Sequence, residues 1–389
     1  MRESGREAAA LAPASAGRAS PIAGLSLVDR SLPAWILLAM GLGLGLGRSV
    51  HGLGRALDGA QVTDGVPASI FVGLLAMMYP PLAKVRFSKL GGVARDRRLL
   101  VASLVLNWVI GPAVMFCFAW LWLADAPAYR TGLIVVGLAR CIAMVLIWND
   151  LAGGDREAAA VLVALNAVFQ IAAYSALAYL YLVVLPGWLG LGGRRIDAPV
   201  GLIASSVALF LGVPLAAGIA TRVLGVCWRG EDWYETHLLP RLGPFALYGL
   251  LFTVVVLFAL QGRAITGHPL DVVRIAVPLV AYFVVMWAGA FVLGRALGLD
   301  YERTATLSFT AAGNNFELAI AVAVGVFGAT SGEALAGVVG PLVEVPVLLT
   351  LVYVSLGLRQ RLLAGASAPA SFGPPLRGRR EIEGADGRR

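Results

Sequence analysis

Ten long apolar runs dominate this sequence and restrict the folds that it can adopt. A helix needs about 20 residues to cross the hydrocarbon core of a bilayer, and most of the runs approach that length. Runs this continuous lack the strict alternation of membrane barrel strands. We therefore predict an all-α polytopic membrane protein with ten transmembrane helices. The runs cover residues 32–47, 66–83, 99–123, 131–148, 158–185, 199–220, 244–260, 275–294, 304–328 and 334–356.

Composition agrees with lipid as the main solvent of this chain. Charged residues make up 14 % of the sequence, against about 25 % in soluble domains. Three cysteines are too few for a secreted disulfide scaffold. The three histidines lie outside the apolar runs, which excludes a histidine metal site at membrane depth. The run GLGLGLG follows no strand, and no Walker motif is visible, so we expect no nucleotide or other cofactor.

The basic residues predict how the chain is oriented. Of its 31 Lys and Arg residues, 23 lie in the two ends of the chain and in the loops after the even-numbered runs. Positive residues favour the cytoplasm, so we expect both termini in the cytoplasm. The protein itself is expected in the plasma membrane. Residues 1–30 and 361–389 have the composition of disordered tails, and we expect residues 31–360 to form one ten-helix membrane domain. Because no soluble domain carries a basic face, we expect no nucleic-acid partner.

Ten helices can arise from a duplicated unit of five, and such a unit must insert in inverted topology. Runs four and nine occupy equivalent places in the two halves. Each contains small residues followed by polar ones, GLARC at 137–141 and TAAGNN at 310–315. We therefore predict that helices 4 and 9 are discontinuous near the middle of the membrane.

Three full charges lie inside the apolar runs: Arg140, Glu317 and Glu344. A charge at a helix centre costs at least about 2.5–3.5 kcal/mol on insertion scales, so each of the three needs a reason. Arg140 and Glu317 fall in the two interrupted runs. They predict a midplane site, and there Arg140 would favour the thiolate of the adjacent Cys141.

The amides of Asn314 and Asn315 belong to the same predicted site. Structural alternatives stay open for its charged groups. Arg140 can form an ion pair with a glutamate, and Cys141 can be a packing residue. Glu344, between two prolines, can satisfy backbone groups that the prolines free.

Several segments resemble the arsenite-efflux permeases of the arsenical-resistance type-three family, in the superfamily of the bile-acid/sodium symporters. The resemblance covers roughly residues 30–360 and follows the order of the predicted helices. Its segments are MMYPPLAKV (77–85), LNWVIGP (106–112), GLARCIAMVLIWNDLAGGD (137–155), LVALNAVFQ (162–170), FTAAGNNFELAIAVAVGVFG (309–328) and VVGPLVEVPVLLTLVYVSL (338–356).

The resemblance implies two inverted five-helix repeats arranged as a panel domain and a core domain, with helices 4 and 9 unwound where they cross. It also implies that Cys141 and Glu317 are essential for moving arsenite out of the cell. As(III) is soft and prefers sulfur ligands, so Cys141 is the expected contact. Asn314 and Asn315 are expected to donate hydrogen bonds to the arsenic hydroxyls. Glu317 is expected to carry the coupling proton, and Arg140 and Glu344 to support the site. The sequence does not settle antimonite transport, a partner ATPase or the oligomeric state.

Three other functions can be weighed against export. A sodium-coupled organic-anion symporter of the same fold would use Arg140 as the anion partner. A second alternative is an intramembrane enzyme with a Cys or Glu catalyst. A catalytic cysteine needs an adjacent base such as histidine, and no histidine lies in any run, so we expect no enzyme activity. A receptor would bind ligand without flux.

Overall fold

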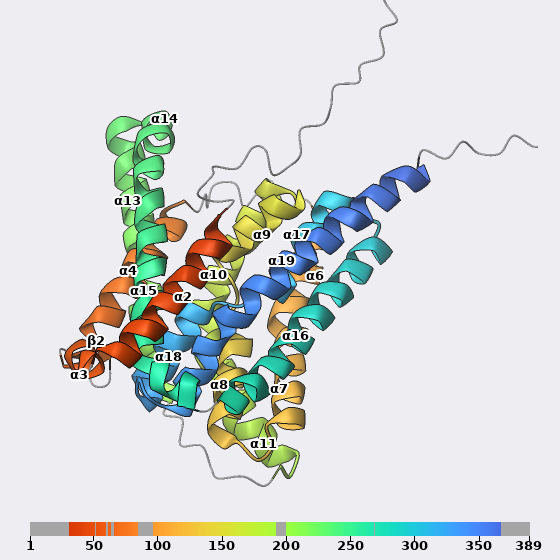
Figure 1. The fold of residues 1–389 in the computed structure, drawn as a ribbon. Helices are drawn as coiled ribbons and strands as arrows, with labels where there is room; N and C mark the ends of the chain where they lie inside the picture. The colour runs from red at the N-terminus through yellow and green to blue at the C-terminus, as the bar shows by residue number, and fades with distance from the viewer. Residues whose placement is uncertain are drawn as a thin grey trace, which may run out of the picture.

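The computed structural model describes residues 31–50, 52–59, 61–63, 66–84, 96–191, 200–267 and 269–366. As predicted, the chain is all-helical (Figure 1). The exception is a short antiparallel pair, β1 (Gln61–Thr63) with β2 (Val66–Pro67), which follows α3 (Leu53–Asp58). The predicted tail at 1–30, and residues 367–389 of the predicted tail at 361–389, lie outside the described residues.

Every apolar run of the sequence corresponds to a helix or to a pair of consecutive helices. Six helices are long and apolar enough to cross a membrane, and three shorter apolar helices accompany them within the described residues. In chain order the runs are α2 (Leu32–Ser49), α4 (Ala68–Ala83), α6 and α7 (Arg97–Val105 and Gly111–Trp122), α8 and α9 (Pro127–Leu138 and Met144–Ala152), α10 and α11 (Arg156–Tyr179 and Leu185–Trp188), α12 and α13 (Val200–Val207 and Val213–Arg229), α14 and α15 (Glu231–Trp233 and Leu239–Gly267), α16 (Pro269–Ala296), α17 and α18 (Tyr301–Ala312 and Phe316–Phe327) and α19 (Gly332–Ala366).

The last helix runs past the predicted end of the ten-helix domain. That end is predicted at residue 360, and α19 continues to Ala366. The residues that follow the apolar run, such as Arg359, Arg361 and Leu362, are good helix formers, so nothing stops the helix where the hydrophobicity ends.

Prolines explain the irregular turns inside the long helices. Proline lacks an N–H, and its ring collides with the carbonyl four residues earlier. A π-helical turn widens the helix and relieves that collision. In the described ranges the π-helical turns are Leu106–Ile110, Leu180–Val184, Ala208–Gly212 and Tyr234–Leu238. The prolines that follow them are Pro112, Pro186, Pro214 and Pro240, and each has its fourth preceding residue at the centre of the turn.

The helices pack as two groups, which lie side by side in Figure 1. One group consists of α2, α4, α13 and α15, and we name it the panel group. Its glycine-rich helix α2 lies very close to α15: a Cβ added to Gly43 would overlap the carbonyl of Val255, and one added to Gly47 would overlap that of Ala259. Small residues permit such close contact in membranes.

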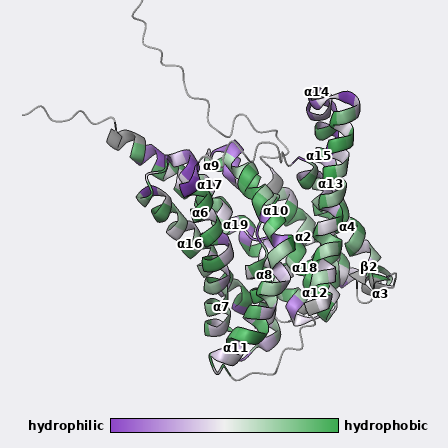
Figure 2. Ribbon diagram, turned by 180° about the vertical axis from the view of Figure 1, so that it is seen from behind, coloured by the Kyte–Doolittle hydropathy of each residue, from purple (hydrophilic) through white to green (hydrophobic). Residues whose placement is uncertain are grey.

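The second group contains α6 to α10 and α16 to α19, and we name it the core group. Residues between the two ends of the molecule are mostly hydrophobic, whereas hydrophilic residues gather near α14 and around α9 and α17 (Figure 2). Helix α12 contacts both α10 and α18 of the core group, while α13, which continues it, packs on α4. One continuous helical segment, residues 201–229, therefore joins the two groups.

Candidate functional site

The two interrupted helices meet at their interruptions, which we name the crossing. Helix α8 ends at Leu138 and α9 begins at Met144; α17 ends at Ala312 and α18 begins at Phe316. Between them, Arg140 and Asn314 pair as an antiparallel bridge. The Cys141 N–H donates to the Gly313 carbonyl at 3.3 Å, and the Asn315 N–H donates to the Ala139 carbonyl at 3.0 Å. The breaks therefore satisfy each other's backbone groups, which membrane burial demands.

The two asparagines of TAAGNN hold this crossing together. The Asn314 side-chain amide donates to the carbonyls of Val136 at 2.9 Å and Ala139 at 3.2 Å. Asn315 caps α18, because its side-chain oxygen accepts the Leu318 N–H at 3.0 Å. Asn314 Oδ1 and Asn315 Nδ2 are buried and have no hydrogen-bond partner in the described structure. Each side chain thus uses one polar end for structure and leaves the other free.

Replacing Asn314 with alanine is expected to loosen the crossing. The variant loses two buried hydrogen bonds, each worth about 0.5–1.5 kcal/mol, although both carbonyls keep a backbone donor. We expect a thermal unfolding midpoint several degrees lower in detergent. Thr350→Ala is the control, because Thr350 is exposed and bonds only within α19. Equal midpoints for the two variants would contradict this account of the crossing.

A small cavity lies beside the crossing, between the panel group and the core group. Its volume is about 30 Å³, and a cavity needs about 10–15 Å³ to hold a single water. The wall carries two carboxyl groups, and none of its residues is basic. The residues that form it are Ile36, Met77, Met144, Leu250, Thr253, Val254, Leu257, Glu317, Ile320, Pro341, Glu344 and Val345.

Glu317 and Glu344 reach this cavity from different helices. Glu317 lies in the first turn of α18, where the positive end of the helix dipole favours a carboxylate. Glu344 lies on α19, is 4 % exposed and lies near the backbone N–H of Asn314. Its Oε1 has no partner among the described residues. Glu344 therefore lies beside the crossing as well as on the cavity wall.

Arg140 is buried, but its guanidinium does not face these carboxyl groups. Nη1 donates to the Tyr282 hydroxyl at 2.8 Å, and Nη2 donates to the Gly137 carbonyl. The Arg140 backbone N–H is bonded to the Gln170 side chain of α10. No ion pair of Arg140 with a glutamate occurs in the described residues. The charge thus lies between α8 and α16, on the side of the crossing away from the cavity.

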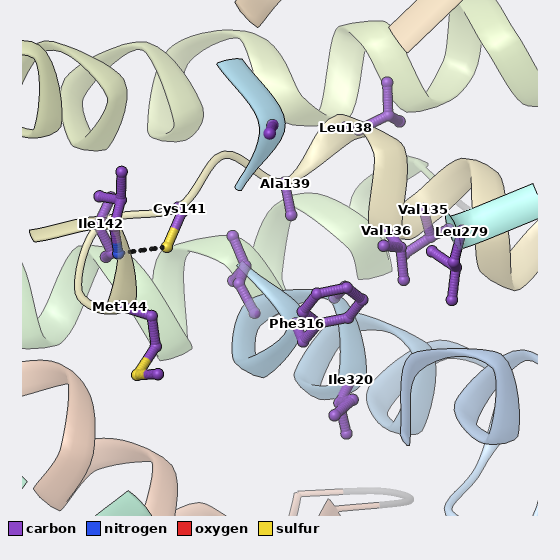
Figure 3. Close-up of a cluster of buried hydrophobic side chains, with 14 of the residues drawn as sticks. Val135, Val136, Leu138, Ala139, Cys141, Ile142, Met144, Leu279, Phe316 and Ile320 are labelled. Carbon is purple, nitrogen blue, oxygen red and sulfur yellow. Dashed lines mark hydrogen bonds between the residues drawn. The ribbon is translucent and has the colours of Figure 1, made fainter. Parts of the chain in front are cut away.

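Cys141 lies at the crossing itself and is 2 % exposed. Its sulfur accepts the Val145 N–H at 3.3 Å (Figure 3). The thiol is near enough to Glu344 and Glu317 to interact with both charges, yet Cys141 does not line the cavity. Glu317 is the predicted site residue that faces the cavity, together with Glu344.

Among the cavity-wall residues that were not predicted from sequence, three carry a sulfur or a hydroxyl group: Met77, Met144 and Thr253. Met144 lies three residues after the GLARC motif, so its position in the first turn after the break could have indicated it. Met77 and Thr253 come from the panel group. Met77 opens the segment MMYPPLAKV, but nothing in that segment or around Thr253 shows which residues face a cavity.

Comparisons with known proteins agree with this architecture. The model of the Sodium Bile acid symporter family matches residues 71–268. The arsenical-resistance protein Acr3 of Corynebacterium glutamicum is 55 % identical over 345 residues, which is 89 % of this chain and 93 % of that protein. This chain belongs to the sodium bile acid symporter family.

Other members of the family lie at greater distance. An uncharacterized transporter of Synechocystis is 35 % identical over 84 % of this chain and 88 % of its own length. Acr3 of Alkaliphilus metalliredigens is 30 % identical over 85 % of this chain and 93 % of its own length. Family membership and the apolar helices together make the chain a multi-pass membrane transporter.

Proposed function

We propose that this protein exports arsenite from the cell in exchange for protons. Two relatives that it matches over most of its length are named arsenical-resistance proteins. The observation that carries the proposal is the cavity beside the crossing, where two carboxyl groups from α18 and α19 meet. Arsenite at neutral pH is an uncharged trihydroxide, so a small cavity without a cation suits it.

Proton coupling follows from the pair of glutamates. Two carboxylates that share one buried space repel each other, which favours holding a proton between them. Glu317 is the proposed carrier, because it is the partly exposed member of the pair. One proton moving inward for each arsenite gains about 2.3 kcal/mol per 100 mV of membrane potential. It gains about 1.4 kcal/mol more per unit of pH gradient.

The crossing supplies the remaining groups. We assign Cys141 as a thiol contact for arsenic, which becomes accessible when its sulfur exchanges the Val145 N–H for the substrate. Asn314 and Asn315 keep their free polar atoms for the arsenic hydroxyls while they hold the backbone in place. Arg140 supports the site from the far side of the crossing. Antimonite, which has the same form and a softer centre, is an expected second substrate.

The proposed transport cycle also rests on the predicted topology. We infer ten membrane-crossing helices in two inverted repeats of five, with both termini in the cytoplasm and the protein in the plasma membrane. Residues 31–360 would form the transporter domain between two disordered tails. Alternating access would then arise from movement of the panel group against the core group.

Expression in an arsenite-sensitive cell tests this function. We expect cells that contain the protein to hold less arsenic than cells with the empty vector, and an uncoupler to abolish the difference. A difference that survives the uncoupler would reject proton coupling, and equal arsenic contents without it would reject export.

A sodium-coupled organic-anion symporter is the alternative function within the family. The cavity argues against it, because two carboxyl groups repel an organic anion and no basic side chain lies on the wall. Sodium-dependent uptake of a bile-acid-like anion would favour this alternative.

A further inference from the structure

Two residues of the cavity wall contain sulfur, and neither is a cysteine. Met144 begins α9 in the core group and is 7 % exposed, and Met77 belongs to α4 in the panel group and is 3 % exposed. They reach the same small space as the two carboxyl groups. The Cys141 sulfur is turned to the α9 backbone instead (Figure 3). A solute in the cavity therefore meets thioethers before it meets the thiol.

Thioether sulfur has the chemistry that weak metalloid binding requires. It is soft and polarizable, and soft ligands match a soft centre such as As(III). Unlike a thiol, it loses no proton on binding and stays neutral. A transport site must bind strongly enough to load and weakly enough to release. Two thioethers meet that condition better than several thiolates would.

The placement of the two methionines on opposite helix groups adds to this argument. A solute held between Met144 and Met77 bridges the core group and the panel group. Separation of the groups removes one sulfur contact, which weakens binding at the step where release is needed. The unbranched side chain of methionine can follow a solute over a short distance, whereas leucine of similar volume cannot offer a donor atom.

We propose that Met144 and Met77 are sulfur contacts in addition to Cys141, and that they select a soft metalloid trihydroxide over neutral hydroxyl compounds of similar size, such as boric acid. The inference deepens the proposed function and rests on it. Glu317 and Glu344 serve the proton, and the methionines recognise the arsenic or antimony atom.

The test compares methionine-to-leucine variants in everted membrane vesicles. Leucine conserves volume closely, and such exchanges in a core cost less than about 1.5 kcal/mol. For Met144→Leu and Met77→Leu we expect the KM for arsenite to rise about tenfold each, the factor equivalent to about 1.4 kcal/mol of binding. Met78→Leu is the matched control: Met78 neighbours Met77 on α4, is 2 % exposed and does not line the cavity. Its KM should not change.

A second measurement does not depend on transport. Arsenite that binds the native state raises the thermal unfolding midpoint of the purified protein. We expect this shift in the wild type and in Met78→Leu, and a smaller shift in the double variant Met77→Leu/Met144→Leu. Boric acid should shift none of them.

The outcomes separate this inference from the proposed function. If the wild type moves arsenite and both cavity variants keep its KM and its thermal shift, the methionines are packing residues and the inference is wrong. If the wild-type vesicles accumulate no arsenite, the proposed function itself fails. If Met78→Leu raises the KM for arsenite as much as Met77→Leu does, the effect comes from the packing of helix α4. That result would also contradict the inference.

Discussion

Glu317→Gln is expected to reduce proton-driven arsenite uptake by everted vesicles to the level of vesicles without the protein. Glutamine keeps the shape of the side chain but cannot carry a proton. Glu317 faces the cavity in the first turn of α18, so the change removes the proposed coupling group without opening the crossing. Labelled arsenite uptake in respiring everted vesicles measures the effect, with the amount of membrane protein determined in parallel.

Glu344→Gln is the matched comparison for this variant. Its carboxyl group shares the cavity and lies near the Asn314 backbone N–H, and the amide of glutamine keeps the shape of the side chain there. We therefore expect at most a partial loss of uptake. Full uptake by Glu317→Gln would remove Glu317 from the proton path, and a greater loss in Glu344→Gln than in Glu317→Gln would exchange their roles.

Cys141→Ser is expected to abolish arsenite uptake while the protein keeps its fold. Serine can accept the Val145 N–H in place of the sulfur, which bonds that group at 3.3 Å, so the start of α9 should survive. Its hard oxygen is a poor ligand for As(III), so the contact proposed for the metalloid is lost. Vesicle uptake gives the activity, and thermal unfolding in detergent shows whether the crossing remains intact.

Cys117→Ser provides the control for loss of a thiol. Cys117 is exposed on α7 and does not line the cavity. Its replacement should therefore leave uptake unchanged. If Cys141→Ser transports arsenite as well as Cys117→Ser does, the buried sulfur serves only to receive a backbone hydrogen bond.

The discontinuities of two helices were predictable from the sequence. In GLARC and TAAGNN, small residues stand beside polar ones within an apolar run, which indicates a break in the helix. The structure interrupts both helices there. The prolines were equally informative. Pro112, Pro186, Pro214 and Pro240 each follow a π-helical turn, which their missing N–H groups explain.

The direction of individual side chains was not predictable to the same degree. Arg140 directly precedes Cys141, yet its guanidinium is bonded to Tyr282 on α16, because an extended backbone directs successive side chains to opposite sides. Periodicity also cannot show which apolar residue of α4 or α15 faces a cavity, since every face of such a helix is apolar. Met77 and Thr253 became visible only when the panel group was placed against the core group.

The most direct test of the account uses the purified protein in liposomes loaded at acid pH, with arsenite added outside. Labelled arsenite and internal pH are followed together. In the wild type we expect arsenite to enter the liposomes while protons leave them in a fixed ratio. In Glu317→Gln we expect neither movement. Arsenite entry without proton release, or coupled movement that persists in Glu317→Gln, would contradict a shared midplane site for the metalloid and the proton.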